Sequence, residues 1–214
     1  MTITMPRLDR SAAFERGITI ADFLVPIRVA EGIGTRIRHI ALIVAGTLLI
    51  TLAAQVRIAI PGDPVPITGQ TFGVLLAGGA LGFRRGIAAS GLYLAIGLVG
   101  LPVFAEGKHG LDVLWGTTGG YLVGFVVAAA IVGRLAELGW DRDFRGSVAA
   151  MVIGSLVIYL LGVPWLAFAA HKPIDWAIQY GLTPFLLGDS IKLALAAVAF
   201  PAAWWFVGKR PGDR

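Results

Sequence analysis

The sequence predicts an all-α integral membrane protein with six transmembrane helices and both termini in the cytoplasm. Hydrophobic residues make up 57% and charged residues 14% of its 214 residues, whereas soluble proteins carry about 25% charged residues. The mean hydropathy is +0.79. The apolar residues also form continuous runs without period-2 alternation, which favours helices over a membrane β-barrel. A chain with so few charges cannot cover a water-soluble surface.

Six apolar segments account for the six helices. A helix needs about 17–25 apolar residues to cross a hydrocarbon core of about 30 Å, and most of the segments reach that length. The second segment is short and rich in glycine. Because lipid offers no water to the backbone, each segment is expected to form its own hydrogen bonds as a helix. In chain order the segments span residues 40–60, 69–83, 87–103, 119–136, 147–169 and 184–207.

The domain organisation follows from these segments. We expect one membrane domain over residues 39–208, a cytoplasmic segment over residues 1–38 and a cytoplasmic tail over residues 209–214. The first segment has no apolar core of the kind that a signal peptide requires. Its stretch "ITIADFLVPIRVAEGIG" (18–34) can form a short helix on an anionic membrane surface. A poorly ordered tail is the alternative.

The basic residues indicate membrane orientation. The net charge is +5, and most Lys and Arg residues lie near the termini or in two short links, "GFRRG" (82–86) and "ELGWDRDFRG" (137–146). Because basic residues favour the cytoplasmic side, the short links are expected inside and the longer links, rich in Pro and Gly, outside. No basic face of a soluble fold is visible, so we predict no nucleic-acid partner.

The sequence lacks the common catalytic and metal-binding motifs. It contains no Cys, which excludes disulfides and thiolate metal sites. It has no P-loop, no H-E-x-x-H and no G-x-S-x-G. His39, His109 and His171 are scattered over loops and span ends, which is typical of interfacial residues. We therefore predict a protein that is not an enzyme and that needs no metal or cofactor.

The stretch "TPFLLGDSIKLALAAVAF" (183–200) places Asp189 and Lys192 in an apolar span. A charged side chain at the bilayer centre costs about 2.5–3.5 kcal/mol on insertion scales. At a spacing of three residues the two side chains share one helix face and can reach each other. One hypothesis is a structural ion pair. The other, which we favour, is a ligand site open to the outer side, where the carboxylate accepts N–H groups and the ammonium binds an acid.

Two outer stretches contribute more polar groups. "VPITGQT" (65–71) places Thr68, Gln70 and Thr71 where the second span begins. A threonine there can simply cap a helix, but the amide of Gln70 requires partners for both its oxygen and its nitrogen. In "WGTTGGYLVGF" (115–125) the glycines at four-residue spacing favour close helix packing, and the neighbouring polar residues can line a pocket.

Four stretches together resemble one known family. They are "VPITGQT" (65–71), "GLVGLPVFAEG" (97–107), "GTTGGYLVGF" (116–125) and "PFLLGDSIK" (184–192). In matching order, over about residues 40–207, they resemble the BioY family, which comprises the biotin-binding membrane subunits of energy-coupling factor (ECF) transporters.

The resemblance implies a multi-pass protein of a bacterial inner membrane that binds biotin at its outer side. It implies a membrane coupling protein and ATPase subunits as partners, with Ala41 and Ala45 of the first helix contacting the coupling protein. The small-residue pattern of these two alanines by itself is equally compatible with packing inside the bundle. The chain departs from the family pattern at residues 116–120 and 186–189. It also departs after "PVFA", where an uncharged Gly-rich loop is expected and residues 106–109 read "EGKH".

The chemistry of biotin, with its ureido group, apolar rings and carboxylated tail, leads to a hypothesis for how these residues would bind it. Asp189, helped by Gln70, would accept hydrogen bonds from the ureido group, while Lys192 would pair with the carboxylate or hold Asp189 in place. Aromatic side chains would cover the apolar rings. The predicted binding set is Asp189, Lys192, Gln70, Thr68, Thr118, Tyr121, Phe104 and Trp115.

Three other functions stay open at this point. An ion- or proton-coupled carrier acting without ATPase partners would use Asp189 as its proton-carrying group. An intramembrane enzyme would use Asp189 and Lys192 as acid and base. A membrane scaffold would bind no ligand.

Overall fold

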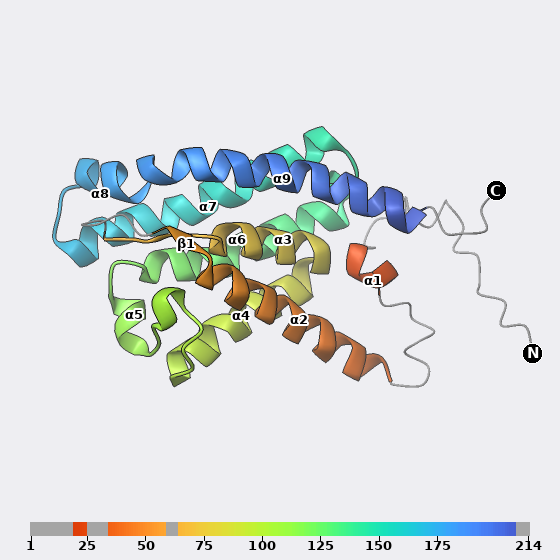
Figure 1. The fold of residues 1–214 in the computed structure, drawn as a ribbon, viewed down its shortest axis with the longest axis horizontal. Coiled ribbons are helices and arrows are strands. Elements are labelled where there is room, and N and C mark those ends of the chain that lie inside the picture. Colours follow the sequence, from red (N-terminus) through yellow and green to blue (C-terminus); the bar gives the residue numbers. More distant parts are fainter. Residues whose placement is uncertain (1–18, 25–33, 59–63, 209–214) are drawn as a thin grey trace, which may run out of the picture.

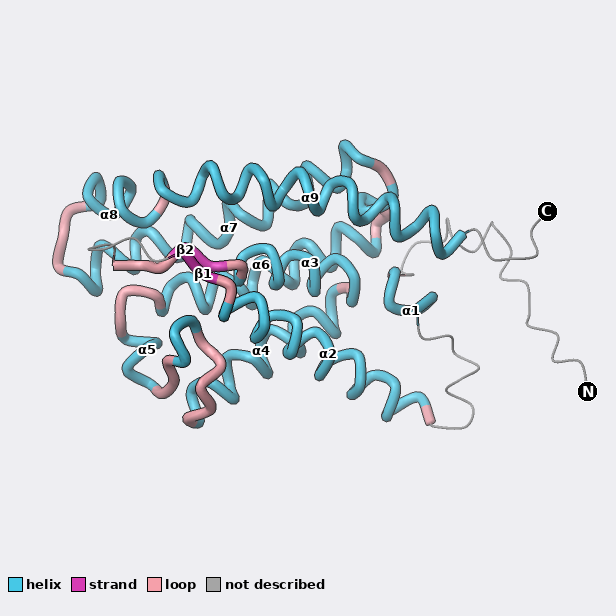
Figure 2. The backbone as a smooth tube through the Cα atoms, viewed as in Figure 1, coloured by secondary structure: helices cyan, strands magenta, loops and turns pink. Residues whose placement is uncertain are grey.

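The chain folds into a bundle of helices (Figures 1 and 2). The computed structural model describes residues 19–24, 34–58 and 64–208. The long helices are α2 (Thr35–Gln55), α3 (Gln70–Leu81), α4 (Phe83–Val99), α6 (Gly119–Glu137), α7 (Phe144–Ala170) and α9 (Thr183–Gly208). The short helical elements are α1 (Ile20–Leu24), η3 (Ala105–Gly107), α5 (Leu111–Trp115), η4 (Trp140–Arg142) and α8 (Ile174–Gly181).

Within the described residues, four helices are long and apolar enough to cross a membrane, namely residues 36–55, 119–137, 144–170 and 183–205. The prediction of a nearly all-helical membrane protein is confirmed at this level. The second and third predicted segments correspond to α3, of 12 residues, and α4, of 17 residues.

The first predicted segment is wrong at its outer end. Helix α2 ends at Gln55, because Arg57 and Ile58 form strand β1 (Arg57–Ile58), which pairs antiparallel with β2 (Ile67–Thr68). Residues 59 and 60 of that prediction lie outside the described residues. The small sheet lies towards the end of the bundle that carries α5 and α8, here called the sheet end, and α1 lies towards the opposite end, here called the α1 end (Figure 1).

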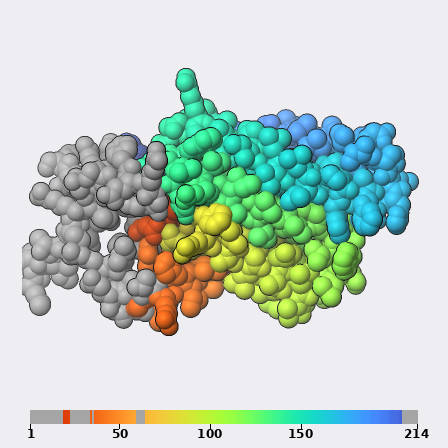
Figure 3. Space-filling model, turned by 180° about the vertical axis from the view of Figure 1, so that it is seen from behind, coloured from red at the N-terminus to blue at the C-terminus, as the bar shows by residue number. Residues whose placement is uncertain are grey.

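Helix α6 lies at the centre and packs against α3, α4 and α7. From behind, α4, α6 and α7 form one continuous face (Figure 3). Glycines permit these close contacts. A methyl group on Gly78 of α3 would lie 2.8 Å from the carbonyl oxygen of Ala129, and one on Gly120 of α6 would lie 2.6 Å from that of Leu161. The interpretation of the 115–125 glycines as packing residues holds at Gly120.

A partly buried ionic cluster ties α1 to the bundle at the α1 end. The carboxylate of Asp22 accepts hydrogen bonds from Arg38 of α2 at 2.9 Å and from Arg85 of α4 at 2.8 and 2.9 Å. The hydroxyl of Thr19 donates to the same carboxylate at 2.9 Å. Helix α1 is therefore docked against the bundle, with Ile20 and Ala21 buried. Residue 18 and residues 25–33 of the predicted surface helix lie outside the described residues.

Candidate functional site

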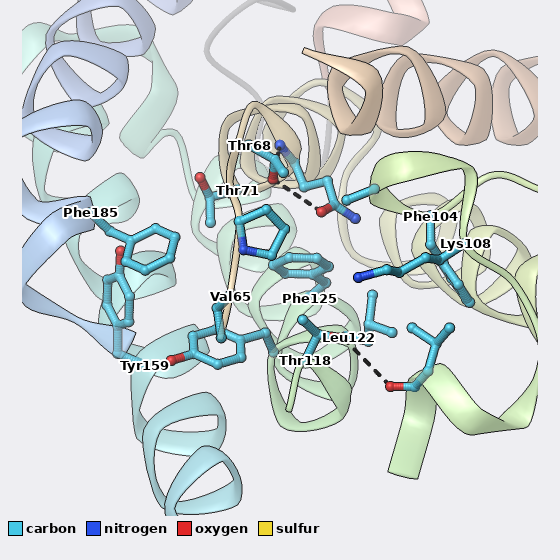
Figure 4. A pocket seen from close by; sticks show the side chains of 15 residues that line it. Val65, Thr68, Thr71, Phe104, Lys108, Thr118, Leu122, Phe125, Tyr159 and Phe185 are labelled. Carbon is cyan, nitrogen blue, oxygen red and sulfur yellow. Dashed lines mark hydrogen bonds between the residues drawn. The ribbon is translucent and has the colours of Figure 1, made fainter. Parts of the chain in front are cut away.

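A pocket lies at the sheet end, between the start of α3, the loop around η3, and helices α6, α7 and α9 (Figure 4). The space free of protein atoms in the pocket and its open mouth, solvent included, is about 600 Å³. Sites for small molecules are usually mostly apolar with a few fixed polar groups. This pocket has that kind of lining.

One wall of the pocket consists of three aromatic rings from three helices. Tyr121 of α6 stacks on Phe185 of α9 with ring centroids 6.5 Å apart, and Tyr159 of α7 meets Phe185 edge-on at 6.3 Å. The hydroxyl of Tyr121 donates to the carbonyl of Gly181 at 2.8 Å. Because each ring is held by the other two, the wall is a preformed apolar surface suited to a flat or fused ring.

The opposite wall contains polar groups where β2 meets α3. The side-chain nitrogen of Gln70 donates to the hydroxyl of Tyr93 at 2.6 Å, and its side-chain oxygen accepts from Thr68 at 3.0 Å. Both amide atoms of Gln70 therefore have partners inside the protein, and its orientation is set before a ligand arrives. Thr71, one residue along α3, also lines the pocket.

Asp189 and Lys192 form an ion pair beside this polar wall, with a distance of 3.0 Å from ammonium to carboxylate. The ammonium also donates to the carbonyl of Thr68 at 2.8 Å and to the hydroxyl of Thr71 at 3.0 Å. The hydroxyl of Tyr159 donates to the other oxygen of Asp189. Since an ammonium has three N–H donors, Lys192 donates all three of its N–H groups to protein acceptors.

The pair does not itself line the large pocket. Asp189 and Lys192 line a smaller neighbouring cavity together with Thr71. Tyr159 and Thr71 separate the two spaces, since both line the large pocket and both contact Asp189. The side chains of Asp189 and Lys192 are 13% and 20% exposed, so the ion pair is mostly withdrawn from solvent.

The other residues predicted from the sequence divide into two groups. Thr68, Gln70, Thr118, Tyr121 and Phe104 line the large pocket. Trp115 does not, because the residue is 68% exposed and its ring contacts Trp165.

Ten of the 15 described residues that line the pocket are missing from the predicted set, and four of those ten carry an aromatic ring or a charge. Tyr159, Phe125 and Phe185 have the pattern of ordinary apolar spans, and only the hydroxyl of Tyr159 within such a run was a usable signal. The fourth, Lys108, follows Glu106 in the loop after "PVFA".

An ion-pair chain stands at the mouth of the pocket. Glu106 accepts from Arg57 at 2.9 Å and from Lys108 at 2.8 Å, one cation on each carboxylate oxygen. The hydrogen bond from Lys108, aided by the charges of Lys108 and Arg57, holds the pKa of Glu106 below its usual value. Glu106 therefore stays ionised at neutral pH.

The BioY family model matches residues 26–209. The chain belongs to the BioY family. The resemblance seen in four sequence stretches is thereby confirmed, and the family consists of transporter subunits, not enzymes.

Two curated relatives and one solved structure agree with this assignment. The biotin transporter BioY of Thermotoga maritima is 43% identical over 157 residues, which is 73% of this chain and 91% of the relative. The biotin transporter BioY2 of Lactococcus lactis subsp. cremoris is 34% identical over 169 residues, covering 77% and 88%. The crystal structure of the S-component for biotin from an ECF-type ABC transporter matches with a TM-score of 0.72 and 28% identity, over 78% of this chain and 90% of that one.

Proposed function

We propose that this chain is a biotin-uptake subunit, which binds biotin in the pocket at the sheet end and delivers it inward as the S component of an ECF transporter. One observation carries the proposal. In a chain of the BioY family, an aromatic pocket and a buried Asp–Lys pair lie side by side at one end of the helix bundle. Biotin has matching parts, namely a ureido group with two N–H donors, apolar fused rings and a carboxylated tail.

Asp189 is the proposed acceptor for the ureido group. A carboxylate offers about four acceptor positions. One oxygen of Asp189 already receives Lys192 and Thr71, whereas the other receives only Tyr159. The second oxygen therefore has capacity for a ligand N–H. A small movement of Tyr159 would open Asp189 to the large pocket.

Lys192 is the proposed positioning group for Asp189. The sequence left open whether it pairs with the ligand's carboxylate or holds Asp189. Its three bonds to Asp189, Thr68 and Thr71 support the second role. Pairing with a ligand acid would require it to give up at least one of them.

We further propose that α2, α3, α4, α6, α7 and α9 all cross the bacterial inner membrane, with the α1 end and both termini in the cytoplasm. Helix α3 is only about 18 Å long at 1.5 Å per residue, but most of its residues are buried, so its neighbours shield it from lipid. The basic residues Arg84, Arg85, Arg142 and Arg145 lie in the links at the α1 end, which supports this orientation.

Helix α2 is the proposed dock for a membrane coupling protein, which would link the chain to ATPase subunits. Ala41 and Ala45 are both exposed on one face of α2, next to the exposed Ile37, Val44 and Leu48. A small-residue face of this kind allows a second helix to approach closely. The matching solved structure is the S-component of an ECF-type ABC transporter, which supports such partners.

Binding of labelled biotin to the purified chain tests the proposal. Wild type is expected to bind, and Asp189→Asn and Lys192→Ala are each expected to lose most of the affinity. Asp175→Asn and Lys172→Ala change exposed residues of the same types and should bind like wild type. Failure of wild type to bind biotin would refute the function, and full affinity in both site variants would refute the site.

Uptake by cells that also carry the coupling and ATPase chains separates the remaining alternatives. The S-component proposal expects uptake to stop when cellular ATP is depleted. Uptake that survives ATP depletion but stops with an uncoupler would indicate an ion- or proton-coupled carrier. Recovery of a chemically altered ligand would indicate an enzyme.

A further inference from the structure

Lys108 is the only charged side chain among the 15 described residues that line the large pocket. Figure 4 shows its side chain extending from the loop into the pocket, towards Phe125. Its side chain is 57% exposed, so it is reachable from the mouth. The aromatic wall lies across the pocket from it (Figure 4).

The loop that carries Lys108 has a defined shape. The backbone N–H of Phe104 donates to the carbonyl of Lys108 at 3.2 Å, and the N–H of Lys108 donates to the carbonyl of Ala105 at 3.2 Å. The side chain of Gln55 donates to the carbonyl of Phe104 at 3.3 Å, which ties the loop to α2. Phe104 is 2% exposed, so its buried ring anchors the loop in the hydrophobic core. The base of Lys108 is therefore held at the pocket mouth.

The group around Lys108 contains two positive charges and one negative charge, so one positive charge lacks a counter-charge within it. Arg57 and Lys108 share the single carboxylate of Glu106. If Arg57 keeps Glu106, Lys108 can turn to another anion without leaving an unpaired acid. Lys192, the other cation near the pocket, has all three N–H donors engaged by Asp189, Thr68 and Thr71. A ligand carboxylate placed in the apolar pocket would need a counter-charge.

We infer that Lys108 binds the ligand's carboxylate and makes the pocket selective for small acids with an apolar body. The inference rests on the proposed function and deepens it by assigning the two ends of the ligand. The N–H end lies towards Asp189, deep beside the aromatic wall, and the acid end lies at the mouth against Lys108. When the ligand's carboxylate binds Lys108, Glu106 stays in its ion pair with Arg57.

The experiment compares biotin with biotinamide, its uncharged amide, on four forms of the chain. These are wild type, Lys108→Gln, Lys108→Arg and the control Lys172→Gln, which changes an exposed lysine in the turn between α7 and α8. We expect Lys108→Gln to weaken biotin binding about tenfold, as for a partly exposed charge-assisted bond, and to leave biotinamide binding unchanged. Lys108→Arg and Lys172→Gln should keep the preference for the acid.

Each other outcome overturns the inference in a distinguishable way. If Lys108→Gln retains both its biotin affinity and the preference over biotinamide, the inference fails and the proposed function stands. If Lys108→Gln weakens both ligands equally, Lys108 serves the loop and not the carboxylate. If wild type binds neither ligand, the proposed function fails and the inference falls with it.

Discussion

Replacing Lys192 by Met removes the ammonium from the buried pair and keeps a side chain of similar length. Asp189 Oδ1, the carbonyl of Thr68 and the hydroxyl of Thr71 each lose a donor. Removing one partner of a buried ion pair costs about 3–5 kcal/mol. Because Tyr159 and Thr71 still donate to Asp189, we expect a loss of about 2–3 kcal/mol in the free energy of unfolding.

The double variant Asp189→Asn with Lys192→Met provides the decisive comparison. It leaves no unpaired charge in the bundle, and the new amide oxygen can still accept from Tyr159. We expect it to lose about 1 kcal/mol, less than Lys192→Met alone, because the two sites are coupled.

The assay is reversible denaturation of the ligand-free chain in detergent, with Lys172→Met as the exposed control. A Lys192→Met loss no larger than that of the control would refute the claim that the protein holds this ammonium. Losses of the two single variants that simply add in the double variant would refute the coupling.

Three further predictions concern stability, each measured by the same denaturation assay. Burial raises the pKa of Asp22, but its bonds to Arg85 and Arg38 outweigh burial and leave the pKa below the usual 3.8. The stabilisation by this cluster is therefore present above about pH 4 and lost below it. Asp22→Asn should lower stability at pH 7 and should flatten the loss of stability on acidification; an unchanged dependence of stability on acid pH would contradict the role of the cluster. Burial raises the pKa of Asp141 to about 6 against the hydrogen bond from Trp204, so this group lowers stability as pH rises from about 4 to 6. Asp141→Asn should remove that decline and gain up to about 3 kcal/mol at pH 7; a loss of stability at pH 7 would show that the charge itself is needed. Gly78→Ala should lower the free energy of unfolding by about 1–3 kcal/mol, because the new methyl group would lie 2.8 Å from the backbone of Ala129. Gly91→Ala, whose methyl group would meet nothing within 4 Å, should be neutral or stabilising by up to about 1 kcal/mol. Equal effects of the two variants would rule out close α3–α6 packing as the reason for Gly78.

Much of the site could be predicted because its residues are chemically unusual for their setting. Asp189 and Lys192 stand out in an apolar span, and Gln70 and Thr68 stand out at a helix start. Trp115 and Tyr159 show the limit of this approach. An aromatic residue within or beside an apolar span can face the pocket or the outside with the same sequence pattern, and Trp115 turned outward while Tyr159 turned inward.

The sequence by itself determined the class of the protein, the positions of its apolar helices and the presence of a charged pair among them. These follow from local properties, since a long apolar run must satisfy its own backbone in lipid and an i, i+3 spacing places two side chains on one face. Only the tertiary structure decided that Lys192 bonds to Thr68, 124 residues away, and that Lys108 faces the pocket. Such contacts depend on how separate helices and loops pack, and no local periodicity encodes that arrangement.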